Sequence, residues 1–407
     1  MIDEILATRG GGGVRIALRE AGRLMELIAG TPEAPGAVGD IVLGRVTAVL
    51  KGMEACFVDI GAERAGFLSL AGRPGPGGSP SPEAPGSGRA SLTEGARVLV
   101  QVGKAAQMGK GAGLTRNVTL PGRYLVLAPC QGRIAVSRRI ADEEARAALE
   151  HALAAIAEPG EGFIVRTAAA GADPAALAED ARELRRRWEA IEDAMGNVEP
   201  PARLHTEAVG IGAVLRDRAH DRLRRVIVDD AGAAGEARAF LAAHLPAVAA
   251  RVEEWDGPGA LFEALGVEDE IAAALLPEVA LPCGGSLVIE ETHAANAIDV
   301  NTARNTGRSG HAETVLATNI EAAGEIARQL RLRNLGGLTV VDFIHMEDED
   351  HRGRVLTALL DGLADDPAFI RATGFSELGL VELARRRGRG PLAEILEAGE
   401  GNEAGAG

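Results

Sequence analysis

The chain has 407 residues, of which 46% are hydrophobic and 25% charged, so its composition is that of an ordinary globular protein with room for about two or three domains. No apolar run is long enough to span a bilayer, and the N-terminus lacks the features of a signal peptide. The three cysteines lie far apart, which argues against a disulfide framework or a structural zinc site and favours a cytoplasmic protein.

The net charge of −16 means that a binding site for nucleic acid must concentrate arginine on particular faces. Arginine runs at 138–139, 185–187 and 385–387 show that such clustering occurs. A solvated helix face is the simpler interpretation of each run taken alone.

The first 37 residues predict strands that belong to a sheet completed later in the chain. Apolar residues alternate at 14–18 and return at 24–28, which predicts two strands joined by a turn. This segment is too short to form a domain alone. The apolar run Val226–Val228, within the segment 212–276, supplies a plausible partner strand.

The segment 38–120 contains short strands at the spacing that is typical of a small β-barrel. Phe57 and Phe67 each alternate with apolar residues, so their rings lie on the face opposite to the barrel core. Two exposed rings suit base stacking, which is worth roughly 1–3 kcal/mol per base. The alternative is that both rings fill a second small core. Lys104 and Lys110 lie on the closing loop, where they could meet phosphates.

The segment 121–211 predicts a further unit of strands and two helices. Within it, Arg166 and Thr167 follow an apolar strand and precede a loop of small residues. A guanidinium, a hydroxyl and nearby backbone amides are the groups that bind a terminal phosphate. The alternative is an arginine at a strand end that pairs with an acid such as Asp173 or Glu179.

The segment 277–387 contains two apolar strands that carry acids, separated by a helix predicted over about 312–333. A strand, a helix and a strand form a crossover unit, which places the two strands side by side and parallel. Asp299 and Asn301 share a face of the first strand, and Asp342 lies inside the second. Buried carboxylates are unfavourable unless they are paired or bound to a cation, so a divalent metal is the simplest remedy. The alternative makes Asp299 a turn residue and Asp342 a structural carboxylate.

The stretches AIDVNTARNTG, from 297, and NIEAAGEIARQLRLRNLGGLTVVDFIHM, from 319, resemble the catalytic core of the ribonuclease E/G family. The resemblance extends over roughly residues 1–387 in the order of the family. It implies an α+β multidomain fold with five parts: an RNase H-like subdomain (1–37 and 212–276), interrupted by an S1-class OB-fold RNA-binding barrel (38–120) and a 5′-sensor subdomain (121–211), and followed by a DNase I-like α/β catalytic subdomain (277–387) and a C-terminal tail (388–407).

The resemblance also implies an activity. We expect a Mg²⁺-dependent endoribonuclease, in which Mn²⁺ can substitute, that cleaves single-stranded mRNA or rRNA precursors in RNA processing or decay. It would favour 5′-monophosphorylated ends and leave 5′-phosphate and 3′-hydroxyl products. The roles implied by the family motifs are Asp299 and Asp342 as metal ligands, Asn301 as the residue that holds a carboxylate or the scissile phosphate, Phe57, Phe67 and Lys110 as RNA contacts, and Arg166 and Thr167 as the 5′-phosphate sensor.

Three departures from the family pattern bear on these expectations. His345 stands where the family usually has aspartate, and Glu377 replaces the arginine of an Arg-Phe-Gly-Leu motif. The CPxC zinc link and the domain after it are absent, so we expect a monomer or a dimer that needs no structural zinc. One alternative is a catalytically weak RNA-binding protein on the same scaffold. Another is metal-free cleavage by paired histidines, for which the candidates are His293, His311, His345 and His351.

Overall fold

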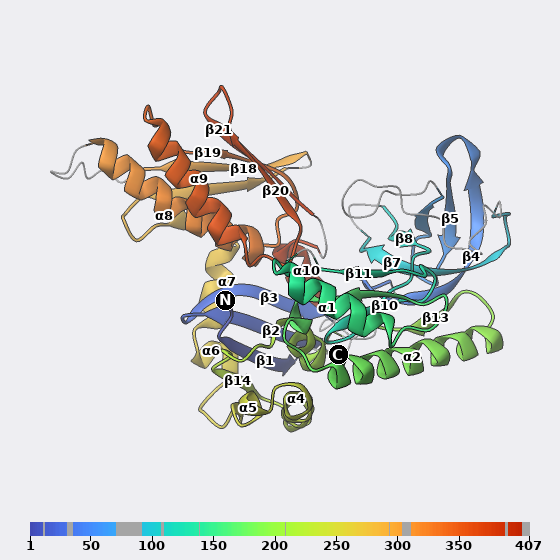
Figure 1. Ribbon diagram of the computed structural model, residues 1–407. Helices are drawn as coiled ribbons and strands as arrows, with labels where there is room; N and C mark the ends of the chain where they lie inside the picture. The colour runs from blue at the N-terminus through green and yellow to red at the C-terminus, as the bar shows by residue number, and fades with distance from the viewer. Residues whose placement is uncertain are drawn as a thin grey trace. The chain divides into compact units, whose positions relative to one another are not determined.

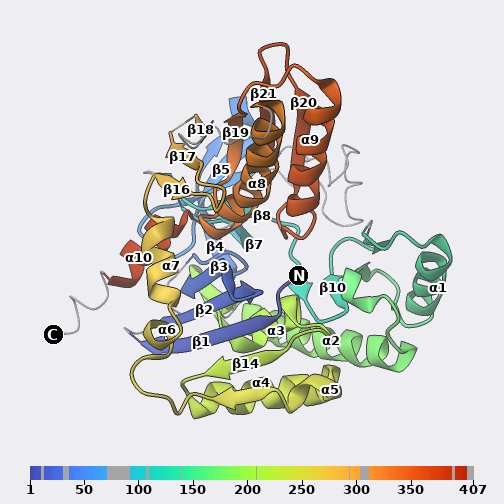
Figure 2. The same ribbon diagram turned by 90° about the vertical axis from the view of Figure 1, so that its left-hand side faces the viewer.

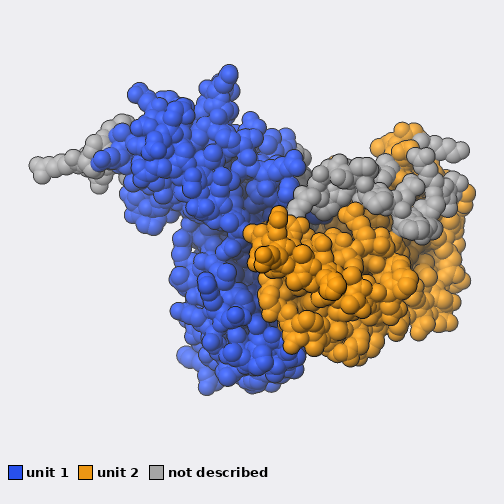
Figure 3. Space-filling model, in the orientation of Figure 1, with its two compact units in different colours: residues 1–32, 209–407 blue, residues 33–208 orange. Residues whose placement is uncertain are grey.

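The computed structural model describes residues 1–10, 13–30, 36–70, 92–106, 110–137, 139–207, 209–292, 294–302, 311–386 and 390–400. Ribbon views from two directions show a mixed α+β protein, as the sequence predicted (Figure 1, Figure 2). The chain divides into two compact units, which are unit 1 (1–32 and 209–407) and unit 2 (33–208) (Figure 3). Among the described residues, no helix is long and apolar enough to cross a membrane.

The first sheet of unit 1, called the N-terminal sheet, has the strand order β15-β14-β1-β2-β3. Its strands are β1 (Glu4–Gly10), β2 (Gly13–Glu20), β3 (Arg23–Gly30), β14 (Arg225–Val228) and β15 (Val252–Glu254). β1, β2 and β3 pair antiparallel, whereas β14 pairs parallel with both β1 and β15. The prediction that the run Val226–Val228 completes this sheet is therefore confirmed.

Helices cover both faces of the N-terminal sheet, because successive residues of a strand point to opposite sides. The helices of this part are α3 (Ile211–Arg218), α4 (Ala231–His244), α5 (Pro246–Ala249), α6 (Leu261–Ala264), α7 (Val267–Ala274) and α10 (Leu392–Glu400). Ile5 of β1 packs with α3, α4 and α5, and Leu6 packs on the opposite face with α6 and α7. Leu392 joins the core of Leu6, so the short helix predicted in the C-terminal tail covers this sheet.

The second sheet of unit 1, called the C-terminal sheet, has the strand order β16-β17-β18-β19-β21-β20. Its strands are β16 (Glu278–Ala280), β17 (Ser286–Glu291), β18 (Ala295–Asn301), β19 (Gly337–Asp342), β20 (Ile370–Phe375) and β21 (Leu380–Arg385). Helices α8 (His311–Leu332) and α9 (Glu349–Leu363) lie side by side along it (Figure 1). Apolar residues of both helices pack with the inward residues of the strands in one core. β18 and β19 are parallel, which confirms the predicted crossover.

Unit 2 begins with a closed barrel, as the spacing of its short strands predicted. The strands are β4 (Ile41–Leu50), β5 (Ala55–Asp59), β6 (Gly66–Ser69), β7 (Arg97–Lys104) and β8 (Gly113–Thr115), and the short 3₁₀ helix η1 (Lys51–Met53) follows β4. The barrel closes because β4 pairs with both β5 and β7. β13 (Ala202–His205) also pairs with β4, so a strand from the segment 121–211 extends the barrel sheet. The predicted subdomain boundaries stay a prediction.

The other sheet of unit 2 has the order β11-β12-β10-β9. Its elements are β9 (Leu120–Pro121), β10 (Leu125–Ala128), β11 (Ile134–Val136), β12 (Gly162–Val165), η2 (Thr167–Ala169), α1 (Glu143–Ala154) and α2 (Pro174–Asn197). α2 begins as predicted, with the Asp173 carboxylate capping its first turn and proline in the first position. Leu177, Leu184 and Ile191 of α2 pack against the sheet.

Candidate functional site

Two aspartates occupy paired positions in the C-terminal sheet. Asp299 lies on β18 and Asp342 ends β19, and the two residues are direct partners in the parallel ladder between these strands. Neighbouring strands lie about 4.8 Å apart, and the side chains of paired residues point to the same face. The two carboxylates are therefore neighbours, although the chain between them includes the whole of α8.

Both carboxylates lie on the exposed face of the sheet, so the expectation that they are buried is wrong. Ile298 and Val300 alternate with Asp299 and point into the core, where they are 2% and 5% exposed. The sequence suggested burial because β19 carries apolar residues on both faces, and Leu338, which shares the open face, is 44% exposed. An exposed pair of carboxylates is accessible to a cation and to a large substrate.

Asn301 fixes the orientation of one carboxylate. Its Nδ2 donates a hydrogen bond of 2.9 Å to Oδ2 of Asp299, and a charged acceptor strengthens such a bond. Across the described ranges, no group of three or more His, Cys, Asp and Glu side chains could hold a metal ion. The open face therefore offers two carboxylates, which is a donor set for a hard cation that keeps most of its water ligands.

Phe57 and Phe67 form an aromatic pair on the outer surface of the barrel. They are direct partners between β5 and β6, and their rings meet edge to face with centroids 6.0 Å apart. Each residue is 36% exposed, and neither belongs to the barrel core around Cys56 and Val58. The alternation predicted for these strands is confirmed, and the second small core is not formed by the described residues.

The line of paired residues that contains Phe57 and Phe67 continues across β8 and β7. Phe67 pairs with Gly113, and Gly113 pairs with Lys104. A Cβ atom at Gly113 would lie 3.2 Å from the Lys104 Cβ, so glycine keeps the surface beside the rings open. Lys110 is exposed just before β8, next to Gly111, where an added Cβ would lie 1.9 Å from the carbonyl oxygen of Ala65. Close backbone approach thus fixes the segment that carries Lys110.

Arg166 and Thr167 lie between β12 and η2. The half-buried Arg166 donates from its backbone N to the Tyr124 carbonyl (2.8 Å) and from Nη1 to the Gly122 carbonyl (2.5 Å). The exposed hydroxyl of Thr167 lies 3.1 Å from the hydroxyl of Ser137. Arg166 and Thr167 thus follow the end of β12, and their role as a phosphate site stays a prediction.

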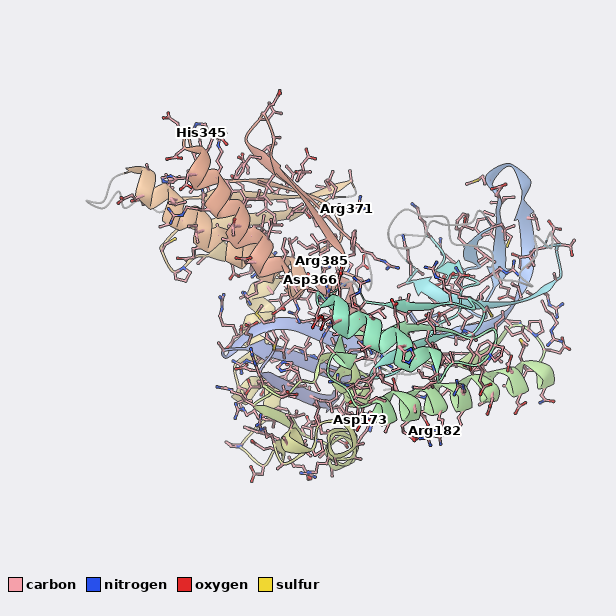
Figure 4. The ribbon with its side chains drawn as sticks, in the orientation of Figure 1. Asp173, Arg182, His345, Asp366, Arg371 and Arg385 are labelled. Atoms are coloured by element: carbon pink, nitrogen blue, oxygen red, sulfur yellow. The ribbon has the colours of Figure 1, made fainter. Side chains whose placement is uncertain are left out.

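The acids proposed as alternative partners of Arg166 have other roles. Asp173 caps α2 by accepting a 2.8 Å hydrogen bond from the Ala175 backbone N (Figure 4). Glu179 forms ion pairs with Arg182 at 2.6 Å and with Arg186 at 3.7 Å.

Comparisons with known proteins relate this geometry to a family. The sequence model of the group described as "Ribonuclease E/G family" matches residues 119–388. Ribonuclease G of Escherichia coli strain K12 is 38% identical over 406 residues, which cover 97% of this chain and 82% of the relative. Ribonuclease G of Haemophilus influenzae is 37% identical over 387 residues, covering 94% and 79% respectively. Ribonuclease E of Haemophilus influenzae is 39% identical over 390 residues, covering 92% and 40%.

The chain belongs to the ribonuclease E/G family. This membership confirms the resemblance inferred from the stretches AIDVNTARNTG and NIEAAGEIARQLRLRNLGGLTVVDFIHM. Positions 303–307 of the first stretch lie outside the described residues.

Buried amides support the aspartates of this ribonuclease E/G family member, and sequence reasoning missed them. The Asn319 side chain on α8 is fully buried, donates to the Ile344 carbonyl at 2.8 Å and accepts from the Ile344 backbone N at 3.1 Å. It therefore holds the backbone two residues beyond Asp342. Beneath the open face, Asn296 of β18 donates to the Thr339 hydroxyl of β19 at 2.9 Å. The only signal in the sequence is a polar residue on an otherwise apolar helix face.

A buried carboxylate supports the loop beneath Arg166 in the same way. The Asp180 side chain on α2 accepts hydrogen bonds from the backbone N atoms of Arg123, Tyr124 and Leu125 at 3.1, 2.8 and 2.8 Å. This turn carries Gly122, whose carbonyl accepts from Arg166. Asp180 falls within the apolar stripe of α2, and that position was its only signal in the sequence.

The histidine candidates are only partly described in this family member. His293 and the side chain of His311 lie outside the described residues. His345 is exposed in the loop after β19, and Nε2 of His351 lies 4.0 Å from Oδ2 of Asp348. Paired-histidine cleavage therefore stays an untested alternative.

Proposed function

We propose that this family member, an endoribonuclease, cleaves single-stranded RNA at Asp299 and Asp342 with a divalent cation. The main support is the direct pairing of the two aspartates on the exposed face of one sheet. A further support is Asn301, which orients one of the two carboxylates.

The donor set fits Mg²⁺. This ion binds through one or two carboxylates and retains several waters, and Mn²⁺ accepts the same oxygen ligands. Two carboxylates on adjacent strands repel each other, and a cation between them removes that repulsion. When bound, such an ion would polarise the scissile phosphate and activate water for in-line attack. Because water is the nucleophile in this proposal, the products carry 5′-phosphate and 3′-hydroxyl ends.

The protein residues have distinct tasks in this proposal. Asp299 and Asp342 hold the cation, and Asn301 keeps the Asp299 carboxylate in one orientation. Phe57 and Phe67 stack on bases of the single strand, and Lys110 binds a phosphate. The exposure of the two rings and the open surface at Gly113 support this mode of RNA binding.

Arg166 and Thr167 bind a 5′-monophosphate in the proposal. Charge-assisted hydrogen bonds of about 1.5–3 kcal/mol each would hold it, and part of that energy would orient the strand. A hydroxyl end lacks the charge, and a triphosphate is too bulky for such a pocket. The neighbouring Thr167 and Ser137 hydroxyls support an oxyanion site at this strand end.

The topology supports the finer fold assignment that family membership suggests. Three antiparallel strands followed by two parallel ones, in the order β15-β14-β1-β2-β3, fit an RNase H-like sheet. The closed barrel fits an S1-class OB-fold, and the C-terminal sheet with α8 and α9 fits a DNase I-like subdomain.

The proposal is tested by cleavage of a 5′-monophosphorylated single-stranded RNA in Mg²⁺ and in EDTA, with analysis of the product ends. We expect cleavage only with the cation, and products with 5′-phosphate and 3′-hydroxyl ends. Cleavage in EDTA, or products that end in 2′,3′-cyclic phosphate, would reject the metal mechanism and favour the histidine alternative.

The sensor is tested by comparing substrates with 5′-monophosphate and 5′-hydroxyl ends. The wild type should cleave the monophosphorylated RNA faster, and Arg166→Ala should lose this preference while retaining activity on the hydroxylated RNA. Equal loss on both substrates would show that Arg166 is structural. Arg182→Ala, an exposed arginine on α2, is the matched control and should leave the preference unchanged.

A further inference from the structure

The open face of the C-terminal sheet extends well beyond the two aspartates. Leu338 lies four residues before Asp342 on β19 and on the same face. It pairs with Ala384 of β21, and Ala384 pairs with Arg371 of β20. Arg371 therefore projects from the face that carries Asp299 and Asp342, about 13 Å along the strands and about 10 Å across them.

A large aromatic ring lies next to this arginine. Phe369 is 59% exposed, and the guanidinium carbon of Arg371 lies 5.5 Å from its ring centroid. Among the described residues, Arg371 forms an ion pair with no carboxylate, although the whole chain carries a net charge of −16. A solvent-exposed phenylalanine beside an arginine without an acid partner is an arrangement that suits a nucleic-acid strand.

Hydrogen bonds hold the backbone that carries the Phe369 ring. Arg385 and Asp366, which precedes Phe369 by three residues, form a buried ion pair with bonds of 2.9 and 3.2 Å (Figure 4). Asp366 also accepts a 2.7 Å bond from the Ala368 backbone N, and the Arg386 backbone N donates to the Phe369 carbonyl at 2.8 Å. The backbone on both sides of the ring is thus fixed before any ligand binds.

We propose that Phe369 and Arg371 form a subsite for the single-stranded RNA that is cleaved at the two aspartates. One base stacks on the Phe369 ring, and Arg371 contacts an adjacent phosphate. Glu382 shares this face and would repel phosphates, so we place the strand over Leu338 and not over Glu382. The inference rests on the proposed function, because it assumes that the substrate reaches Asp342 along this face.

The test uses the full chain and a 5′-monophosphorylated single-stranded oligonucleotide. Phe369→Ala should raise KM at least about fivefold, the lower limit for a base stacked on an aromatic ring, and leave kcat nearly unchanged. Phe369→Tyr should retain the wild-type KM. In the inactive Asp342→Asn background, Arg371→Ala should weaken RNA binding and reduce the slope of log Kd against log salt by about 0.7.

Arg354→Ala is the matched control, because Arg354 is an exposed arginine on α9, the helix that packs against the opposite face of the sheet. An unchanged KM in Phe369→Ala, or an equal effect of Arg354→Ala, would overturn the subsite. A lowered Tm without rescue by Phe369→Tyr would show that the ring is structural.

The two proposals fail in different ways. If Asp299→Asn still cleaves while Phe369→Ala raises KM, cleavage at the two aspartates is refuted, and Phe369 is a contact for RNA that is cleaved elsewhere. If Asp299→Asn is inactive while Phe369→Ala behaves like wild type, the subsite fails and the proposed function stands.

Discussion

Replacing Asn319 tests whether a buried amide on α8 positions the second aspartate. In Asn319→Leu the side chain keeps a similar volume, but the Ile344 backbone N and carbonyl lose their hydrogen bonds to the Asn319 amide. Each buried bond lost costs about 1–2 kcal/mol, so unfolding should become easier by about 2–4 kcal/mol. For a unit of this size, that loss lowers Tm by roughly 4–16 °C.

The same change should also impair catalysis. Ile344 follows Asp342 by two residues. Without the two hydrogen bonds from Asn319 to the Ile344 backbone, the end of β19 is free to move. A displacement of about 1 Å at a reacting group can reduce rates about 100-fold, so kcat/KM should fall by about 10- to 100-fold at a temperature where the variant is folded. Thermal unfolding and cleavage of a single-stranded RNA measure the two effects.

Asn197→Leu provides the matched control, because Asn197 is exposed at the end of α2 and its side chain donates to the nearby Asp193 carbonyl of the same helix. It should change stability by less than about 0.5 kcal/mol. A lowered Tm with unchanged kcat/KM in Asn319→Leu would show that Asn319 does not position Asp342. An unchanged Tm would refute the hydrogen-bond argument itself.

Three further predictions concern other parts of the chain. Asp366→Ala should destabilise the fold by about 3–5 kcal/mol, because the buried Arg385 guanidinium loses its carboxylate partner. Adding Arg385→Met should recover most of this loss, and a double variant as unstable as Asp366→Ala would contradict the prediction. Phe57→Ala should weaken RNA binding by about 5- to 150-fold without lowering Tm, whereas Met53→Ala, also exposed on the barrel, should do neither; equal binding by Phe57→Ala would exclude stacking. Burial raises the pKa of Asp40 above 3.8, so its carboxyl favours folding in acid and disfavours it as pH rises through the raised pKa. Asp40→Asn should therefore raise the free energy of unfolding towards neutral pH but not in acid. Denaturant titrations that show the same increase in the free energy of unfolding at every pH would refute this prediction.

Local rules predicted the parts of the fold that depend on neighbouring residues. The alternation around Phe57 placed its ring outside the barrel, because side chains of a strand point to alternate faces. The crossover rule placed Asp299 and Asp342 on adjacent parallel strands. The Asp173-Pro174 pair predicted the start of α2.

The parts that could not be predicted depend on contacts between distant residues. The exposure of Asp342 depends on which face of β19 the helices cover, and β19 is apolar on both faces. Asn319 and Asp180 bond to backbone groups 25 and more than 50 residues away, which leaves no pattern in the nearby sequence. The place of Arg371 depends on the register between β20 and β21, which includes a shift.

Titration with Mn²⁺, followed by its paramagnetic resonance signal, tests the central claim most directly, because Mn²⁺ takes the oxygen ligands that Mg²⁺ takes. We predict that the wild type binds the ion and that Asp299→Asn and Asp342→Asn both lose that binding together with RNA cleavage, while each keeps its affinity for single-stranded RNA. If both variants bind Mn²⁺ as the wild type does, or if either cleaves RNA at the wild-type rate, the two aspartates do not form the metal site.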